Sequence, residues 1–337
     1  MKYTATTMGT RSAMRGKTFF FYFAARYSAA LMLDKKKPYT SLFLLYLNQM
    51  VIRGSALLDE SPEDLKKQHG FNIIHQTWKN ETIPKKEMKN YKSWPKHHPN
   101  AYIVLWTDED NLKLVEKFYP EYLSTYNGLK LPIQKVDMVR LMYLHRYGGI
   151  YADMDYEARQ NIVKYFPQPL GDVMIVESPV LLNEVMQNSL MVATTLYHPF
   201  WKACLDSIRE IVSFINSPEA CKVNKWGGCE LLQFFHNPLT SKMSNMLFTL
   251  YITGPTVLDK TWLRSRDKNW NLKLLPKERF FVGDVAVHHQ SNSWVNVPKA
   301  MPELISLCVI VYILIIAISI VVCILFFRKR RLKMMMT

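Results

Sequence analysis

The stretch Ile133-Gln-Lys-Val-Asp-Met-Val-Arg-Leu-Met-Tyr-Leu-His-Arg-Tyr-Gly-Gly-Ile-Tyr-Ala-Asp-Met-Asp155 decides the fold class of this chain. Its first two thirds carry apolar residues at a helical period. Gly148 and Gly149 then end the helix and permit a sharp turn. A short apolar segment follows and leads to a pair of aspartates. The stretch therefore predicts a helix, a glycine turn and a strand with carboxylates at its end.

Two pairs of charged residues inside this stretch indicate chemistry. Asp137 and Arg140 are three positions apart, so they share one face of the helix. Asp153 and Asp155 are two positions apart, so both side chains point the same way in an extended chain. Two carboxylates together are a ready site for a hard divalent cation. The first pair also fits an ordinary intrahelical ion pair, and the second also fits a solvated acidic turn.

An Asp-x-Asp triplet alone is weak evidence, because Asp108-Glu-Asp110 is another one in the same chain. That triplet follows an apolar segment and precedes a helical pattern, so it is better interpreted as an acidic helix start. Asp153 and Asp155 differ because they come with the preceding helix, the paired glycines and the Asp137/Arg140 face.

Strand and helix patterns alternate along the chain, which predicts an α/β sandwich with a mainly parallel sheet. The predicted strands cover 72–78, 101–106, 150–152 and 173–177, and the predicted helices cover 85–91, 108–119, 133–147, 199–215 and 257–263. Ligands bind beyond the carboxyl ends of the strands in such sheets. Trp78 ends the first of these strands, so it fits either a stacking partner for a nucleotide base or a core residue.

The formal charge of +15 is unevenly placed. Residues 1–54 carry +8 and the tail 328–337 carries +5, which leaves only +2 for residues 55–327. A nucleic-acid binder is expected to concentrate its basic charge on the folded domain. The basic charge of this chain lies in its tails instead, so we do not expect nucleic acid as its partner.

A membrane segment explains the basic tail. Residues 304–327 contain no charged side chain, and 24 residues are long enough to cross a bilayer as a helix. Positive flanks stay cytoplasmic, so residues 328–337 form a cytoplasmic tail and the domain at 65–300 is expected to be lumenal. The basic N-terminal region, 1–64, contains a short apolar segment at about 41–52 that fits a signal anchor, a cleaved signal peptide or an interfacial segment.

The motifs of other enzyme classes are missing from the sequence. It contains no G-x-S-x-G nucleophile elbow, no phosphate-binding glycine loop and no zinc-protease histidine spacing. The paired carboxylates remain as the candidate site. A cation held by two carboxylates takes further ligands, which substrate phosphates commonly supply.

Several motifs, in one order, resemble those of family 32 glycosyltransferases, which include fungal outer-chain mannosyltransferases and inositol-phosphoceramide mannosyltransferases. The matching segments are Ile74–Lys79, His98-Pro99, Leu105–Glu109, Ile133–Asp155, Asn188, His198-Pro199, Thr253–Pro255 and Ser293-Trp294. The resemblance implies a GT-A fold, that is, a Rossmann-like nucleotide-sugar-binding sandwich. It also implies a nucleotide-sugar donor, a Mn²⁺ or Mg²⁺ ion, and transfer with retention of anomeric configuration.

The resemblance also implies residue roles. The implied donor-binding residues are Trp78, Asp137, Arg140, Tyr151, Asp153, Asn188, Ser293 and Trp294. Asp153 and Asp155 are the implied metal ligands, and His289, preferred over His288, is the implied third one. Each histidine also fits a hydrogen-bonded structural role, and Tyr151 also fits a packed strand residue. No protein nucleophile or catalytic base is assigned.

These expectations combine into a membrane-anchored enzyme of the Golgi or ER. It is expected to move a hexose, mannose from GDP-mannose by preference, to a glycolipid acceptor such as inositol phosphoceramide. One alternative is a glycosyltransferase that uses a UDP-sugar and acts on protein-linked glycans. A second alternative is a catalytically silent lumenal sugar-binding protein.

Overall fold

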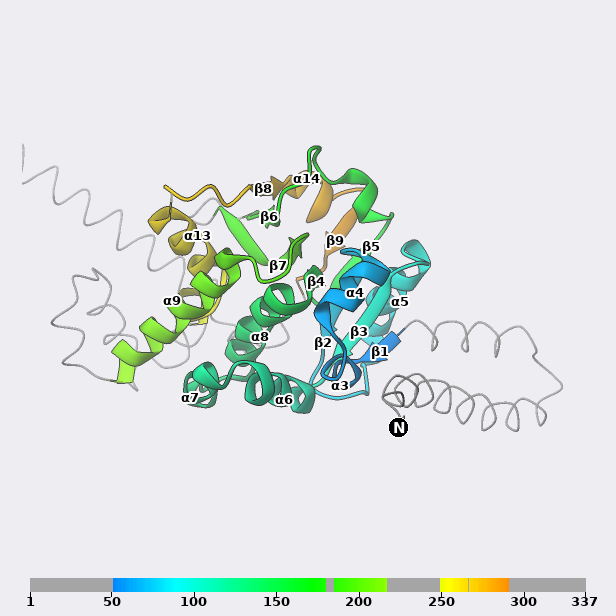
Figure 1. Cartoon of the computed structure of the whole chain (residues 1–337). Helices are drawn as coiled ribbons and strands as arrows, with labels where there is room; N and C mark the ends of the chain where they lie inside the picture. The colour runs from blue at the N-terminus through cyan, green and yellow to red at the C-terminus, as the bar shows by residue number, and fades with distance from the viewer. Residues whose placement is uncertain (1–50, 180–184, 217–248, 266, 291–337) are drawn as a thin grey trace, which may run out of the picture. The chain divides into compact units, whose positions relative to one another are not determined.

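A seven-stranded mixed sheet forms the centre of the computed structural model, which describes residues 51–179, 185–216, 249–265 and 267–290 (Figure 1). The sheet strands are β1 (Val51–Arg53), β2 (Ile73–Thr77), β3 (Tyr102–Trp106), β4 (Gly149–Ala152), β6 (Val173–Glu177), β7 (Met186–Ala193) and β8 (Leu272–Leu275). Their order is β1-β3-β2-β4-β7-β6-β8. A separate two-stranded ribbon pairs β5 (Tyr156–Ala158) with β9 (Ala286–His288).

Helices cover the sheet and connect its strands. They are α3 (Gly54–Leu57), α4 (Pro62–His69), α5 (Lys85–His97), α6 (Asp108–Phe118), α7 (Leu123–Gly128), α8 (Pro132–Tyr147), α9 (Pro199–Asn216), α13 (Pro255–Arg264) and α14 (Lys277–Phe280), with short 3-10 turns at η1 (Pro120–Tyr122) and η2 (Ile162–Tyr165). The predicted alternation of strands and helices is confirmed by this order.

Most neighbouring strands are parallel, as the alternation predicts. β1, β3, β2 and β4 run parallel to one another, and β8 runs parallel to β6. β7 is antiparallel to both of its neighbours, β4 and β6. The sheet is therefore parallel on the side that carries β2 and β4, whose carboxyl ends lead to Trp78 and to the aspartate pair.

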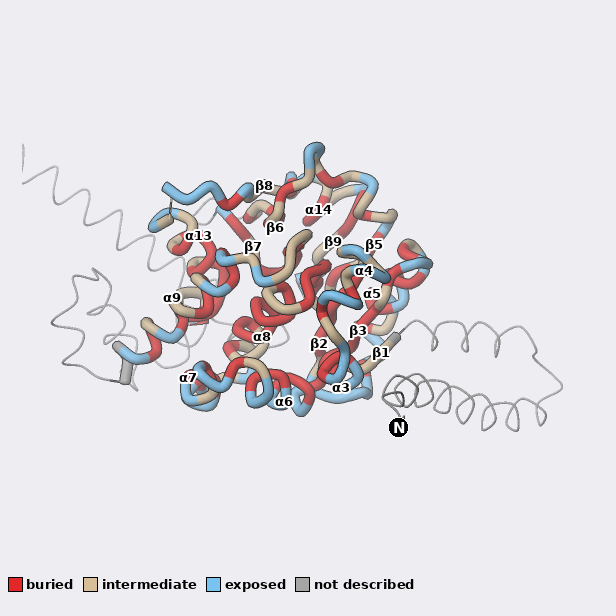
Figure 2. Tube along the Cα trace, in the orientation of Figure 1, coloured by how far each residue is buried: buried red, intermediate tan, exposed pale blue. Residues whose placement is uncertain are grey.

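Side chains alternate between the two faces of the sheet and build two cores. On β6, Val173 and Ile175 join the core under α8 and α9, whereas Met174 and Val176 join the core under α5, α14 and the ribbon. The result is a three-layer sandwich. Figure 2 shows that α8 is buried along most of its length, whereas α6 and α7 expose one side.

The folded unit begins upstream of the expected boundary at residue 65. Val51–Arg53 pair in parallel with Ile103–Leu105 at the edge of the sheet. The last two residues of the expected anchor segment, 41–52, are therefore part of a strand. Both are β-branched, which suits a half-buried strand.

The segments that carry the membrane expectations lie mostly outside the described residues. These are the apolar segment at 304–327, the cytoplasmic tail at 328–337 and most of the region 1–64. Across the four described ranges, no helix combines the length and the apolarity needed to cross a membrane.

Candidate metal and donor site

The aspartate pair lies in a tight turn between β4 and β5. The amide of Asp153 donates to the carbonyl of Ser189 at 2.9 Å, which extends the pairing of β4 with β7 by one residue. The amide of Tyr156 then donates to the carbonyl of Asp153 at 2.9 Å and closes the turn. Asp153 and Asp155 thus occupy a turn rather than the extended strand end that the spacing predicts, yet both carboxylates reach the same place.

His288 is the third member of this group. Its Nε2 lies 2.9 Å from an oxygen of Asp155 and 3.9 Å from one of Asp153. One ligand atom from each of the three residues lies within 4.8 Å of the other two. Two carboxylate oxygens and an imidazole nitrogen, all half-buried, form a donor set that suits a divalent cation such as Mn²⁺. The side chains therefore fit the metal that the resemblance implies.

His289, the expected third ligand, points elsewhere. It follows the last residue of β9, His288, and its ring turns to another carboxylate. The Nε2 of His289 lies 2.9 Å from a carboxylate oxygen of Glu157. Its amide donates to the carbonyl of Asp155 at 3.0 Å. The candidate ligand group in the structure thus contains His288, whereas the ring of His289 pairs with Glu157.

The ring of His288 is held in place by packing. It stacks on Tyr156 at a centroid distance of 4.9 Å and meets the edge of Phe281 at 4.9 Å. Its amide donates to the carbonyl of Phe281 at 2.8 Å. These contacts fix the direction in which Nε2 points.

The two oxygens of Asp153 have different surroundings. The hydroxyl of Tyr151 donates to Oδ1 at 2.6 Å, and Nη2 of Arg140 lies 3.3 Å from the same oxygen. Oδ2 instead faces His288. Tyr151 and Arg140 therefore orient the carboxylate, and Oδ2 is the oxygen directed at the metal site.

Arg140 is the centre of a buried polar network. Nη2 pairs with Asp137 at 3.1 Å, and Nη1 donates to the carbonyl of Asn188 at 2.8 Å. Asn188 and Thr253 donate to the two oxygens of Asp137, each at 2.9 Å. The intrahelical pair predicted at i,i+3 is present, but the guanidinium also reaches Asp153. The network thus links α8, β7 and the loop before α13 to the aspartate turn.

Burial and charge shift the pKa values in this network. Burial raises the pKa of Asp137 to about 6, although Arg140 and two hydrogen bonds act against the increase. Burial also raises the pKa of Asp153, against the opposing effect of Arg140. Burial alone would lower the pKa of Arg140, but Asp153, Tyr151 and Asp137 outweigh it and raise the pKa. The guanidinium therefore stays charged and keeps a buried positive charge beside the site.

Trp78 lies close to the same turn. Its amide donates to the carbonyl of Trp106 at 3.0 Å, which fixes it at the end of β2. Its half-buried ring packs against a small apolar cluster that includes Met154, the residue between the two aspartates. The structure therefore brings Trp78 to the aspartate turn, whereas Ser293 and Trp294 lie outside the described residues.

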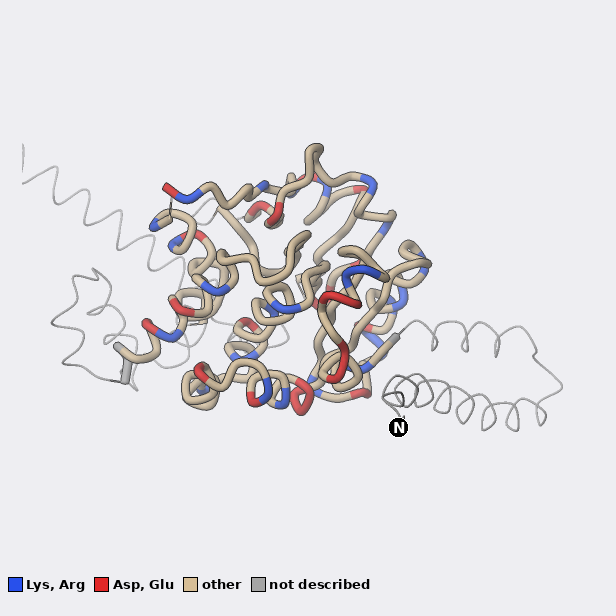
Figure 3. The backbone as a smooth tube through the Cα atoms, in the orientation of Figure 1, with Lys and Arg blue, Asp and Glu red and all other residues tan. Residues whose placement is uncertain are grey.

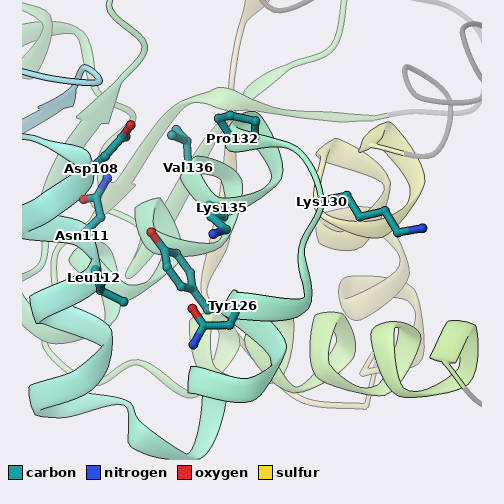
Figure 4. Close-up of a pocket in the computed structure, with 9 residues that line it drawn as sticks. Asp108, Asn111, Leu112, Tyr126, Lys130, Pro132, Lys135 and Val136 are labelled. Carbon is teal, nitrogen blue, oxygen red and sulfur yellow. The ribbon is translucent and has the colours of Figure 1, made fainter.

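A hollow of about 260 Å³ opens on the other side of α8, at the end of β3 (Figure 4). Its lining comprises Asp108, Asn111, Leu112, Tyr126, Asn127, Lys130, Pro132, Lys135 and Val136. Val136 directly precedes Asp137, and the amide of Asp108 lies 3.4 Å from the carbonyl of Lys79. The hollow is thus lined in part by the first turns of α8, the helix that carries Asp137, and lies near the end of β2. It is lined by polar and charged groups around a tyrosine ring.

The interpretation of Asp108 and Asp110 as a helix start is confirmed. Thr107 is the N-cap of α6, and its hydroxyl accepts from the amide of Asp110 while Asp110 accepts from the amide of Thr107. Arg53 also donates to Asp110. This triplet holds the end of β3 to the start of α6.

Two parts of the network have little signal in the sequence. Thr253 lies 116 residues from Asp137, and only its place before Gly254-Pro255, at a helix start, singles it out. The bond from Tyr151 to Asp153 spans two residues, but an aromatic in a buried strand is most often a packing residue. The sequence otherwise singles out both residues only through the resemblance, whose matching residues include Thr253 and Tyr151.

Comparisons with known proteins point to one class of enzyme. Residues 84–179 match the family model described as "Glycosyltransferase sugar-binding region containing DXD motif". An inositol phosphoceramide mannosyltransferase of Schizosaccharomyces pombe is 43% identical over 25% of this chain and 23% of its own length. A mannosyl phosphorylinositol ceramide synthase of Saccharomyces cerevisiae is 33% identical over 41% of this chain and 34% of its own length. The chain thus aligns with about a third or less of these relatives.

A solved structure of the ligand-free glycosyltransferase domain of the YGT toxin also matches, at 10% sequence identity and a TM-score of 0.44, over 62% of this chain and 80% of that one. The family match contains the aspartate turn, Asp137 and Arg140. The resemblance drawn from Ile133–Asp155 is thereby confirmed: residues 84–179 match the sugar-binding region of DXD glycosyltransferases.

Proposed function

We propose that this protein is a metal-dependent, retaining hexosyltransferase that moves mannose from GDP-mannose to a glycolipid acceptor such as inositol phosphoceramide. The observation that carries the proposal is the convergence of Asp153, Asp155 and His288 beside the buried Arg140. The names of the two fungal relatives support mannose as the sugar and a sphingolipid as the acceptor. The proposal includes a lumenal domain in the Golgi or ER, anchored by residues 304–327.

Asp155, Asp153 and His288 would hold a Mn²⁺ or Mg²⁺ ion. When bound, such an ion neutralises the charge that develops on the diphosphate as it leaves. Arg140 places a permanent positive charge next to this site, because its pKa is raised and its guanidinium is fixed by three acceptors. Preorganised charge of this kind stabilises a transition state without reorganisation at the moment of reaction.

The nucleoside of the donor has a candidate place in the hollow beside Val136. The hollow is large enough to accept part of a nucleoside, and three of its lining residues belong to α8, the helix that carries Asp137. Trp78 offers an aromatic face at the neighbouring strand end. Asp108 offers a carboxylate that can accept the two N–H groups on the Watson–Crick edge of guanine, which supports GDP over UDP.

Asp155→Ala tests the proposal directly. We expect donor hydrolysis and mannose transfer to fall by at least about 10²-fold, because the variant loses a carboxylate oxygen directed at the cation. Activity is measured with GDP-mannose in the presence of Mn²⁺, Mg²⁺ or EDTA. Glu116→Ala is the matched control, since it removes an exposed acid from α6 outside the segments that carry the resemblance. Turnover of Asp155→Ala at the wild-type rate would rule out the metal mechanism.

The donor and the acceptor are tested separately. Thermal shifts with GDP-mannose, UDP-galactose and UDP-N-acetylglucosamine, each with Mn²⁺, should show the largest stabilisation for GDP-mannose. A larger shift with either UDP-sugar would support the protein-glycan alternative. Binding of a nucleotide-sugar without any turnover would support the silent sugar-binding protein.

A further inference from the structure

A groove of about 440 Å³ runs between α5 and β5, beside the aspartate turn. Its lining comprises Lys89, Lys92, Ser93, Lys96, His97, Glu157, Ala158 and Arg159. None of these residues belongs to the metal site or to the network around Arg140. We call this feature the α5 groove.

The lysines of α5 form one stripe. Lys85, Lys89, Lys92 and Lys96 are separated by four, three and four residues, so they lie on one face of the helix. All four are exposed, and lysine and arginine positions recur along α5 in Figure 3. The opposite face of the helix is buried against the sheet and the ribbon. The stripe is therefore not needed for packing.

The groove is formed before any ligand arrives. Nε1 of Trp94 donates to the carbonyl of Tyr156 at 3.0 Å, and the amide of Ala158 donates to the hydroxyl of Ser93 at 2.8 Å. These two buried bonds fix α5 against β5. The spacing between the lysine stripe and the strand is consequently set by the fold.

The charge that faces the groove is strongly positive. Glu157 is the one acid in its lining, and it is already paired with Lys89 at 3.0 Å and with His289 at 2.9 Å. Burial lowers the pKa of His97, so that residue is neutral at pH 7. Lys92 and Lys96 have no acid within ion-pair distance among the residues that the structure describes. The ammonium groups of Lys92 and Lys96 can therefore bind an anionic ligand in the groove.

The groove begins close to the metal site. Glu157 is two residues beyond Asp155 in the chain. His289 joins the two places, because its ring pairs with Glu157 and its amide binds the carbonyl of Asp155. A ligand that lies in the groove can thus place a neighbouring group at the metal site.

We propose that the α5 groove binds the phosphodiester of the acceptor lipid's headgroup and so brings the acceptor hydroxyl to the donor sugar. The inference rests on the proposed function and adds the acceptor's anchoring group to it. Lysines present compact, flexible charges, which suit a phosphate that stays in contact with solvent. The open groove between an exposed stripe and a strand fits a headgroup at a membrane surface better than it fits an enclosed small molecule.

The test compares two acceptors on the full chain in detergent micelles. One acceptor is inositol phosphoceramide, and the other carries the same inositol on a lipid without the phosphodiester. For the double variant Lys92→Ala/Lys96→Ala, we expect the KM for the phosphodiester acceptor to rise roughly tenfold. The KM for the neutral acceptor, the KM for GDP-mannose and the rate of donor hydrolysis should stay at wild-type values.

The matched control is Lys67→Ala/Lys268→Ala, which removes two exposed lysines outside the groove. It should leave every one of these values unchanged. Pull-down of the detergent-solubilised full chain on beads coated with either inositol phosphoceramide or phosphatidylserine separates recognition of the headgroup from general anionic charge. Selective loss of binding to the first beads supports the proposal, and equal loss on both kinds of bead overturns it in favour of a general anionic surface.

Two other outcomes are decisive. Equal KM values for the groove variant and the wild type with the phosphodiester acceptor overturn the groove proposal and leave the proposed function intact. If the wild type neither hydrolyses GDP-mannose nor transfers mannose, the proposed function fails. In that case the pull-down still decides whether the groove recognises the phosphodiester.

Discussion

His288 is the last residue of β9 and His289 follows it, and their rings have different partners. His288 faces the aspartates, and His289 faces Glu157. We expect His288→Ala to weaken Mn²⁺ binding by about tenfold or more, because a ligand is lost. His289→Ala should bind Mn²⁺ nearly as the wild type does. Titration calorimetry with MnCl₂ measures both variants, and the reverse order of affinities would contradict the assignment.

His75 is one of three histidines, with His98 and His145, whose burial should make this fold sensitive to acid. Nε1 of Trp106 donates to its Nδ1 at 3.1 Å, so its Nε2 donates to the carbonyl of Gly148 at 2.9 Å, and the ring is neutral. Burial lowers the pKa of His75 to about 4. The unfolded chain therefore binds a proton that the folded chain does not bind between the unfolded pKa, about 6.5, and about 4.

The stability that His75 contributes is complete above pH 6.5 and is lost as the pH falls toward 4. Urea unfolding at pH 7 and pH 5 should show that the wild type loses about 2 kcal/mol through this residue. His75→Gln keeps a donor and an acceptor but does not titrate, so its loss should be smaller by that amount. Equal losses in both proteins would show that His75 does not set the acid sensitivity.

At the scale of single residues, spacing along the chain predicts only local relations. The shared face of Asp137 and Arg140 follows from a separation of three residues in a helix. Asn188 and Thr253, which complete the network, come from segments 51 and 116 residues away from Asp137. No local sequence pattern predicts contacts between residues so far apart in the chain. The choice between two adjacent histidines likewise depends on the register of β9 against β5.

At the scale of elements, the two glycines after α8 determine where the aspartates lie. Gly148 and Gly149 both have positive φ, at 64° and 88°. A Cβ on Gly149 would lie 2.4 Å from the carbonyl oxygen of Ile73 in β2, closer than real Cβ contacts. The turn therefore permits β4 to pair with β2 directly after the helix ends.

Gly149→Ala should destabilise the protein more than Gly70→Ala, which is its matched control. Gly70 also has a positive φ, 63°, but a Cβ there would meet no atom within 4 Å. Backbone strain costs about 1–3 kcal/mol at either position, and the overlap adds about 1–3 kcal/mol at Gly149 alone. Chemical denaturation measures the difference. Equal destabilisation by the two substitutions would show that close approach to β2 is not the constraint.

The helix, the glycine turn and the strand were predictable because their signals are local. β7 was not predicted as a strand, and the reason is physical. Asn188 and Ser189 interrupt its apolar pattern in the sequence. Both are there for the site: Asn188 holds Asp137 and Arg140, and the carbonyl of Ser189 binds the amide of Asp153. The polar residues that interrupt the apolar pattern of β7 are thus the same residues that contact the site.

At the scale of the whole molecule, the lumenal topology gives a separate prediction. Asn80-Glu-Thr82 is a glycosylation sequon, and both Asn80 and Thr82 are exposed in the loop after β2. If the domain enters the lumen as proposed, the full chain expressed in eukaryotic cells should carry a glycan at Asn80. Treatment with peptide-N-glycosidase F should then increase its electrophoretic mobility.

Asn80→Gln is the control for this experiment and should migrate like the enzyme-treated wild type. Protease protection in sealed microsomes gives a second readout, because a lumenal domain should be cleaved only after detergent is added. Cleavage without detergent, together with an unmodified Asn80, would place the domain on the cytoplasmic side. Basic residues follow the apolar segment at 304–327, and such residues stay on the cytoplasmic side of a membrane. We therefore expect a glycan at Asn80 and protection of the domain from protease until detergent is added.

The ribbon of β5 and β9 has a consequence for how the enzyme matures. Glu157 and His289 meet across 132 residues of chain, and Asp155 and His288 meet beside them. During synthesis, a ribosome must therefore translate beyond β9 before the third metal ligand exists. A nascent or truncated chain that stops earlier has the aspartates but cannot complete the cation's ligand set. Metal uptake would thus come late in folding and would distinguish finished molecules from incomplete ones.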